Sequence, residues 1–570
     1  MHLRCGQAFR KLRETLTFDA GMEVIGNARA AMHLPRRGAA SGWLWPVANC
    51  PTDSTAAGAS RAEITMNARA PSVPLLIFLL LAPTYAYFYQ STQHNEAARF
   101  DQARAILEER QFFINSFAWN TADVVVIKVD GVERVFPAKA PGSSFLAVAP
   151  MFLTRSIGQL AGIPDWLLWH IVVYVCIVLL VAVPSALAAA AFYDISVRVT
   201  QARTASLLSI VAVWLGSILF PFSTLYFGHA QTAALLVASF WIIFRFRHDG
   251  EKAFARPRLM LALAGISAGF AVINEYPAIF AAVPLGGYFL AALWSHQGLQ
   301  RQKLRLADAF AAGALAMVAV LLAYNVAAFD KLFFAPYQAL DSESAFPGGA
   351  LGFAGIHWPG WKNFTDVLAQ TLLLPQRGLL YLNPVLITAL PGFVLWFRSR
   401  IFRLELVLVA ALAVIFVVEN ACYGNSIVYW GGGASTGPRQ VILMLPFLAL
   451  PIAFFARTWR WVFLVPLVAS VFFMLCATST QPRIGYDEQN PLREFFIPNF
   501  MAGKFGLDDG ALFDPDNHRL LGAYNAFNLG GLARIPGVWQ MLPLLVWWAL
   551  IAVRARRALA APKPDAASAG

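Results

Sequence analysis

Long apolar segments recur along most of this chain and restrict its fold more than any other feature. A helix needs about 20 predominantly apolar residues to cross the hydrocarbon core of a bilayer. On that rule the sequence predicts an all-α polytopic membrane protein with about twelve transmembrane helices. The expected spans lie near residues 72–90, 166–192, 205–222, 228–246, 259–275, 277–294, 307–328, 379–397, 404–421, 440–455, 461–477 and 537–553.

The charge content agrees with a membrane protein. Charged residues make up 13% of the chain, whereas soluble domains contain about 25%. The net charge of +12 does not indicate a nucleic-acid partner, because the basic residues stand in short clusters at the ends of apolar segments, where topology requires them. The five cysteines are scattered and form no CxxC pair, so neither a disulfide framework nor a zinc site is predicted.

Lysine and arginine occur mainly in alternate connectors between the apolar segments. The positive-inside rule makes these connectors and both chain termini cytoplasmic. The segments 91–165, 329–378 and 478–536 and the glycine-rich turn 422–439 are then extracytoplasmic. We therefore expect a multi-pass protein of the inner (plasma) membrane whose working face is outside. The basic connector residues are Arg198, Arg203, Arg245, Arg247, Lys252, Arg256, Arg258, Arg301, Lys303, Arg305, Arg398, Arg400, Arg403, Arg457, Arg460, Arg554, Arg556 and Arg557.

The first 65 residues differ in composition from the rest and contain no apolar segment long enough for a signal. Two interpretations stay open: a disordered basic cytoplasmic tail, or translation that begins at Met66, where a short basic stretch precedes an apolar one. The remaining chain is expected to form a membrane domain over 66–477, an extracytoplasmic cap over 478–536, and a last transmembrane helix with a cytoplasmic tail over 537–570.

The first outer loop is the longest polar segment between two spans. Its residues 96–110 are predicted to form an interfacial helix, because apolar side chains recur at i, i+3 and i+7 from Phe100. At 100° per residue Glu96 and Arg99 lie on that apolar side, and Asp101 points the other way. A carboxylate and a guanidinium turned toward the membrane indicate function; the alternative is a mutual i,i+3 ion pair.

Two further features follow in the same loop. The sequence VVVIKVDGVERVF has β-branched residues on both sides of Asp130-Gly131, which predicts a hairpin. The next segment, Lys139-Ala140-Pro141-Gly142, is a rigid turn that would place the Lys139 ammonium where it can meet a phosphate.

At these residues the sequence resembles the GT-C superfamily of polyprenyl-phosphate-sugar-dependent glycosyltransferases, near the protein O-mannosyltransferases and the lipid A aminoarabinose transferase. That group has an acidic residue before an Arg-Tyr-like pair on the first outer helix, followed by a Lys-Pro-Pro-like turn. Glu and Phe replace the usual Asp and Tyr here. The matching segments, spread over most of residues 72–455, are Glu96-Ala97-Ala98-Arg99-Phe100, Lys139-Ala140-Pro141, Arg377-Gly378-Leu379-Leu380-Tyr381-Leu382-Asn383-Pro384, and Trp430-Gly431-Gly432-Gly433 with Gly437-Pro438-Arg439.

The resemblance implies transfer of a sugar from a polyprenyl phosphate to an acceptor hydroxyl. Such a reaction needs a carboxylate that takes the acceptor proton and cations that stabilise the leaving phosphate. The candidate bases are Glu96, Asp101 and Asp123. The candidate phosphate ligands are Lys139, Arg99, Arg377 and Arg439. Turn capping is the alternative role for Asp123, and interfacial anchoring that for Arg377.

Substrate contacts are expected from His229, Tyr423 and Trp430, although a histidine at a helix end and aromatic residues at an interface also have structural roles. Glu275 and Glu419 lie near the outer ends of spans. An ionisable side chain there is costly to bury, so each is a candidate functional residue. Carboxylate oxygens suit a divalent cation, but no residues have the spacing of a metal site. No metal ligands are predicted, and a divalent cation stays an open alternative.

Two other classes remain. A transporter or flippase of a lipid-linked saccharide would place charged residues near the middle of the membrane, whereas the candidates here lie near its outer boundary. A polysaccharide polymerase or ligase usually has its large loop late in the chain, and here the largest loop comes first. The expected partners are a polyprenyl-phosphate sugar, the bilayer and an acceptor that is a glycan, a lipid or a protein.

Overall fold

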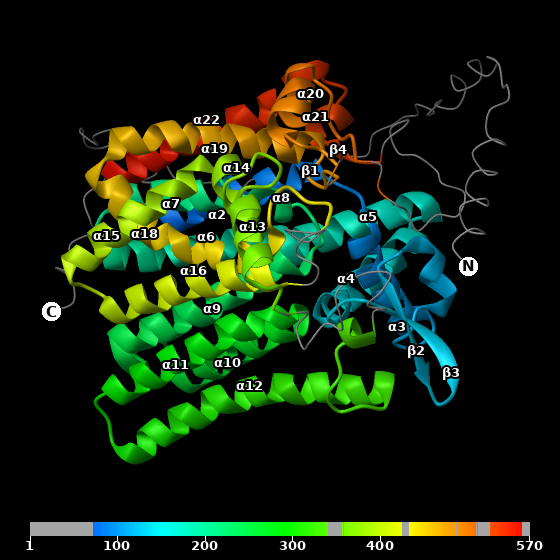
Figure 1. Ribbon diagram of the computed structural model, residues 1–570, viewed down its shortest axis with the longest axis horizontal. Coiled ribbons are helices and arrows are strands. Elements are labelled where there is room, and N and C mark those ends of the chain that lie inside the picture. Colours follow the sequence, from blue (N-terminus) through cyan, green and yellow to red (C-terminus); the bar gives the residue numbers. More distant parts are fainter. Residues whose placement is uncertain are drawn as a thin grey trace, which may run out of the picture. The chain divides into compact units, whose positions relative to one another are not determined.

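The computed structural model describes residues 72–339, 356, 358–423, 433–485, 487–508, 510 and 525–560. The predicted tail over 1–65 and the candidate Trp430 lie outside these residues. The chain is a helical membrane protein, as the sequence predicts, and helices fill most of the described part (Figure 1).

Nine helical segments within the described part are long and apolar enough to cross a membrane. They are formed by α5 (Asp165–Ile177), η2 (Val178–Ala182) and α6 (Val183–Thr200) as one segment, α9 (Gly228–Asp249), α10 (Pro257–Asn274), α11 (Ile279–Ser295), α12 (Gln300–Phe329), α16 (Arg403–Cys422), η8 (Arg439–Met444) with α18 (Leu445–Thr458), α19 (Arg460–Thr480), and η10 (Gly537–Met541) with α22 (Leu542–Ala560).

Three shorter apolar helices occupy the other predicted spans, so the count of twelve stays a prediction. They are α2 (Val73–Ala86), α7 (Arg203–Trp214) and α15 (Ala389–Ser399), the last preceded by α14 (Leu379–Leu382) and η7 (Pro384–Thr388). The break before η7 has a local cause: Pro384 disfavours helical backbone at the residue before it, and Asn383 has φ −131° and ψ 68°. Another short helix, α8 (Leu219–Phe222), follows α7.

Helices α10, α11 and α12 lie side by side (Figure 1). Glycines let α10 and α12 approach closely, as small residues do in membrane helix pairs. A Cβ at Gly265 would collide with the carbonyl oxygen of Phe310, and one at Gly313 with that of Ala262. Among the described residues little packs against α12, and 11% of its most apolar 18-residue stretch is buried. Such an exposed apolar face suits contact with lipid.

The first outer loop has the predicted helix and hairpin. Helix α3 spans His94–Glu108, and β2 (Val124–Val129) pairs antiparallel with β3 (Val132–Pro137) around Asp130-Gly131. A 3-10 helix, η1 (Asn115–Asn120), precedes the hairpin, and α4 (Gly142–Leu160) follows it. A second ladder pairs β1 (Phe88–Tyr89) with β4 (Phe527–Asn528), which ties the last part of the chain to the first.

We call the end of the bundle that carries α3, α4 and the hairpin the loop end (right in Figure 1). The starts of α9, α11 and η8 and the ends of α10 and α16 lie there. Smaller elements of the described part are η3 (Gly250–Ala253), η4 (Tyr276–Ala278), η5 (Pro336–Ala339), α13 (Trp361–Leu372), η9 (Pro491–Phe496), α20 (Ile497–Met501) and α21 (Leu529–Leu532).

We call the opposite end the arginine end, because the basic connectors gather there. Arg198 of α6 contacts Asp194 at 3.0 Å and Asp249 at 3.1 Å, and Arg245 of α9 contacts the same two carboxylates. Arg457 donates to the carbonyl oxygen of Thr200 at 2.6 Å. The positive-inside rule predicts that these connectors share one membrane side, and the structure does bring them to one end.

Candidate functional site

A buried ion pair joins the first outer loop to the helical bundle. Nη2 of Arg99, on α3, lies 2.6 Å from Oε1 of Glu275, in the turn between α10 and η4. Arg99 also donates from Nε to Asn95 at 3.2 Å and from Nη1 to Ser143 at 3.0 Å. Burial raises the pKa of Glu275, but Arg99 and the other cations nearby hold it below its ordinary value. Both side chains are therefore charged and fixed in place.

The turn that carries Lys139 is pressed against the end of α10. A Cβ at Gly142 would lie 2.6 Å from the Cα atom of Asn274, so no other residue fits this position without movement. Next to it, Oγ of Ser143 lies 2.7 Å from Oδ1 of Asn274 and 2.8 Å from Oε1 of Gln231. This polar contact fixes the place of the turn in the bundle.

Lys139 and Asp123 form the second ion pair of the site, with Nζ 2.6 Å from Oδ2. Asp123 directly precedes β2, and its side chain keeps a quarter of its surface exposed. Burial lowers the pKa of Lys139; Asp123 opposes this, while Arg439 and Arg99 lower it further. Lys139 thus lies within electrostatic reach of Arg439 and Arg99. Arg99 is paired with Glu275 and Lys139 with Asp123, so Arg439 is the one of these three cations for which the described residues supply no ion pair.

Arg439 reaches this group from the start of η8. The turn before it requires glycine at Gly437, whose φ is +86°. The guanidinium lies over the Phe227 ring at 5.4 Å from its centroid. Within the described part of the chain Nε of Arg439 has no hydrogen-bond partner, so it is available for a ligand.

Unpartnered polar atoms surround the same place. Both carboxylate oxygens of Glu419 and both amide heteroatoms of Asn420, at the end of α16, have no hydrogen-bond partner among the described residues. Nδ1 of His229 lies 3.7 Å from Oε1 of Glu275, and Gln440 is close to the same ring. Buried polar groups are normally paired. These atoms lie near the ion pair of Arg99 and Glu275.

Two of the sequence candidates have other partners. Oε1 of Glu96 accepts from Nη1 of Arg483 at 2.5 Å, so Glu96 and Arg99 do not form the i,i+3 pair that was the alternative. Asp101 accepts from Nδ2 of Asn120 at 3.1 Å, on the opposite side of α3. Neither carboxylate contacts Lys139, whose partner is Asp123.

The other candidates lie at the edge of the group. Arg377 is buried and donates from Nη1 to the carbonyl oxygen of Gly433, in the turn before Arg439. Tyr423, just past Glu419, forms a backbone bridge with Ile356. Within the residues that the structure describes, no group of three or more His, Cys, Asp or Glu side chains is arranged to hold a metal ion.

Arg483 and Asp508 are the structural partners that the sequence analysis missed. Both lie in the predicted cap segment, and neither belongs to a motif. Glu275 and Glu419 were indicated only by their position near span ends, which is a weak signal. A basic residue just after a span on the outer side, against the charge rule, is the one feature that singles out Arg483.

Substitution of Asp101 with Asn is expected to remove a pH dependence of stability. Burial raises the pKa of Asp101 from its ordinary value near 3.8 to about 8. The folded protein therefore keeps a proton that the unfolded chain loses above pH 4, and stability falls as the pH rises from about 4 to 8. Asn does not titrate and keeps an acceptor for Asn120. Thermal denaturation in detergent should show Asp101→Asn equal to wild type at pH 4.5 and more stable at pH 8; an equal difference at both pH values would contradict this.

Comparison with known proteins gives limited help. No family model matches the chain, and no curated protein matches it by sequence. Two solved structures are similar: ArnT from Cupriavidus metallidurans bound to undecaprenyl phosphate, at 12% identity and a TM-score of 0.44, and its apo state, at 13% and 0.43. Each match covers 85% of this chain and 74% of the other. Because these scores are low, we infer the function from the geometry of the site.

Proposed function

We propose that this protein transfers a glycosyl group from a polyprenyl-phosphate-linked sugar to an acceptor hydroxyl at the extracytoplasmic membrane face. The proposal rests on one observation: at the loop end of the bundle Lys139 pairs with the Asp123 carboxylate and has the cations Arg439 and Arg99 nearby. Cations crowded around one place suit a phosphate, and a carboxylate next to them suits acid–base chemistry.

The orientation follows from charge. The arginine end is cytoplasmic by the positive-inside rule, which puts both termini inside and the loop end outside. A polyprenyl chain lies in the bilayer and presents its phosphate at the membrane boundary, which is where the ends of α10 and α16 bring Glu275 and Glu419. The sugar then extends among the unpartnered side chains of Glu419 and Asn420.

The chemistry is a single displacement. The acceptor oxygen forms a bond to the anomeric carbon, the bond from that carbon to the phosphate oxygen breaks, and its electron pair leaves with the lipid phosphate. Asp123 takes the acceptor proton, and Lys139 and Arg439 stabilise the charge on the phosphate. In the free protein the Lys139 ammonium forms an ion pair with the Asp123 carboxylate. Binding of the donor phosphate to Lys139 would release that carboxylate, so the base becomes available only once the donor is bound.

Substitution of Lys139 or Arg439 with Ala is expected to lower transfer and weaken donor binding by about 10- to 100-fold each, because a charged hydrogen bond is worth about 1.5–3 kcal/mol. The measurement is transfer from a panel of radiolabelled polyprenyl-phosphate sugars by purified protein in liposomes. Lys128→Ala is the matched control, since Lys128 is an exposed lysine of β2.

Equal activity of Lys139→Ala and Lys128→Ala would refute the assignment of the phosphate site. Wild-type protein that transfers no sugar but moves labelled lipid between leaflets would replace the proposal with the flippase alternative.

A further inference from the structure

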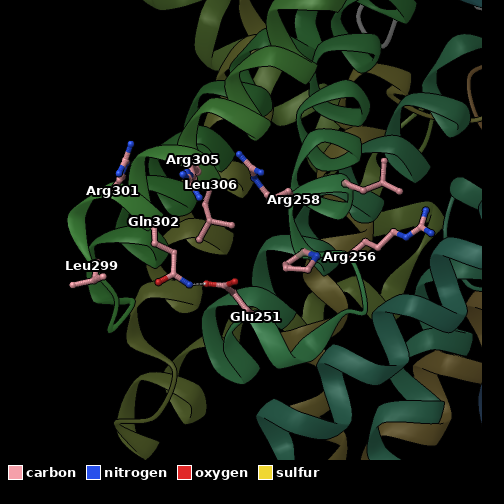
Figure 2. A pocket seen from close by; sticks show the side chains of 10 residues that line it. Glu251, Arg256, Arg258, Leu299, Arg301, Gln302, Arg305 and Leu306 are labelled. Atoms are coloured by element: carbon pink, nitrogen blue, oxygen red, sulfur yellow. Dashed lines mark hydrogen bonds between the residues drawn. The ribbon is translucent and has the colours of Figure 1, made fainter.

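A cavity of about 680 Å³ opens at the arginine end, far along α10 and α12 from the candidate active site (Figure 2). It lies where the connector after α9 meets the starts of α10 and α12. Its walls are apolar at Leu259, Leu299 and Leu306, and its remaining surface is mainly basic. The cavity is therefore amphipathic, with one wall on the lipid-facing helix α12.

Four arginines line this cavity: Arg256, Arg258, Arg301 and Arg305. Figure 2 shows Arg258 at the start of α10 and Arg301 and Arg305 at the start of α12. Glu251, the acidic residue of the lining, is already held by Gln302 and lies 3.3 Å from Nε2 of His296. Across the described residues none of the four arginines forms an ion pair.

The neighbouring connector shows how the fold otherwise treats arginines at this end. Arg198 and Arg245 each contact two carboxylates, Asp194 and Asp249, and Arg247 lies 3.4 Å from Glu405. The cavity contains four residues of the same type and one carboxylate, Glu251, which pairs with none of them among the described contacts. Topology alone requires only that basic residues stand on this side; it does not require two connectors to bring four of them around one apolar-walled space.

We propose that this cavity binds the phosphate group of an anionic lipid of the cytoplasmic leaflet. Guanidinium groups pair with phosphate oxygens two at a time, and basic pockets between transmembrane helices on the cytoplasmic side suit such headgroups. The three leucines offer an apolar surface for the acyl chains of such a lipid, and the exposed face of α12 continues that surface. The inference does not depend on the transfer reaction.

The test is lipid retention by full-length protein, measured by native mass spectrometry after purification in detergent with added cardiolipin. Arg301→Gln with Arg305→Gln should weaken cardiolipin binding about 30-fold, as two surface cations near an anionic headgroup are lost. The matched control is Arg398→Gln with Arg400→Gln, two exposed arginines of another connector at this end. The four arginines that these variants change, Arg301, Arg305, Arg398 and Arg400, are all exposed. The melting temperature of both double variants should therefore equal that of wild type.

A third arm uses inorganic phosphate alone as competitor. Loss of cardiolipin from wild type at millimolar phosphate would support a phosphate site that a soluble phosphorylated ligand can also fill. Retention despite phosphate would support a lipid-specific site. The proposal is overturned if the cavity variant retains as much cardiolipin as wild type, or if the control pair loses as much as the cavity pair.

Discussion

Asp123→Asn is expected to reduce the rate constant for transfer by about 10²- to 10⁴-fold, the usual contribution of a general base. The amide has nearly the same shape as the carboxylate but cannot take the acceptor proton. Its oxygen can still accept from Lys139, which lies 2.6 Å from Asp123 in the ion pair. We therefore expect kcat to fall while the KM for the donor changes little. The measurement is the steady-state rate of transfer in liposomes as the concentration of the lipid donor varies.

A matched control is available on the same hairpin. Asp130 lies at the tip between β2 and β3, with its side chain 73% exposed, and its φ of +53° suits Asn as well as Asp. Asp130→Asn should transfer at the wild-type rate. If Asp123→Asn also keeps at least half of the wild-type kcat, another carboxylate is the base, and Glu419→Gln becomes the variant to measure.

The local elements of this chain could be predicted from sequence because their causes are local. The hairpin depends on Asp130-Gly131, where φ is positive at both residues, and on the β-branched residues beside them. Helix α3 follows the periodicity of its apolar residues and begins two residues earlier than expected, at His94 rather than Glu96. Each of these features depends on a few neighbouring residues.

The partners of the charged residues could not be predicted in the same way. Arg99 binds Glu275, 176 positions further along the chain, and Glu96 binds Arg483, 387 positions further along. The helical wheel correctly put Glu96 and Arg99 on one side of α3. However, two side chains one turn apart can either pair with each other or reach different neighbours, and the packing of distant helices decides which. The sequence alone carries no measure of that packing.

The sequence also identified Lys139, Asp123 and Arg439 as candidates. In the structure Lys139 pairs with Asp123, and Arg439 lies within electrostatic reach of Lys139 and of His229. Lys139 was indicated by its rigid turn after the predicted hairpin, and Asp123 and Arg439 by the charges that the transfer reaction needs. Glu96 and Asp101, on the predicted loop helix, instead contact Arg483 and Asn120, partners that their places on the helix do not reveal.

Arg483 holds the segment after α19 against the start of α3. It donates from Nη1 to Glu96 at 2.5 Å and from Nε to Asp508 at 2.7 Å, and it also bonds to the carbonyl oxygen of Gln90. The three charged side chains are almost completely buried. Because Asn95 and Arg99 lie on the helix that begins here, this buried triad also positions the candidate site.

Arg483→Met is therefore expected to lower the free energy of unfolding by about 3–5 kcal/mol, since it leaves two carboxylates buried without a counterion. The triple variant with Glu96→Gln and Asp508→Asn should recover most of that loss, because no buried charge then remains unpaired. Denaturant titration in micelles measures both. The control is Arg134→Met, which removes a 4.0 Å pair with the exposed Asp130 and should cost less than about 1 kcal/mol. If Arg483→Met costs no more than this control, the buried triad does not stabilise the fold. If the triple variant is as unstable as Arg483→Met, the loss comes from packing of the arginine stem and its backbone contacts and not from unpaired charge.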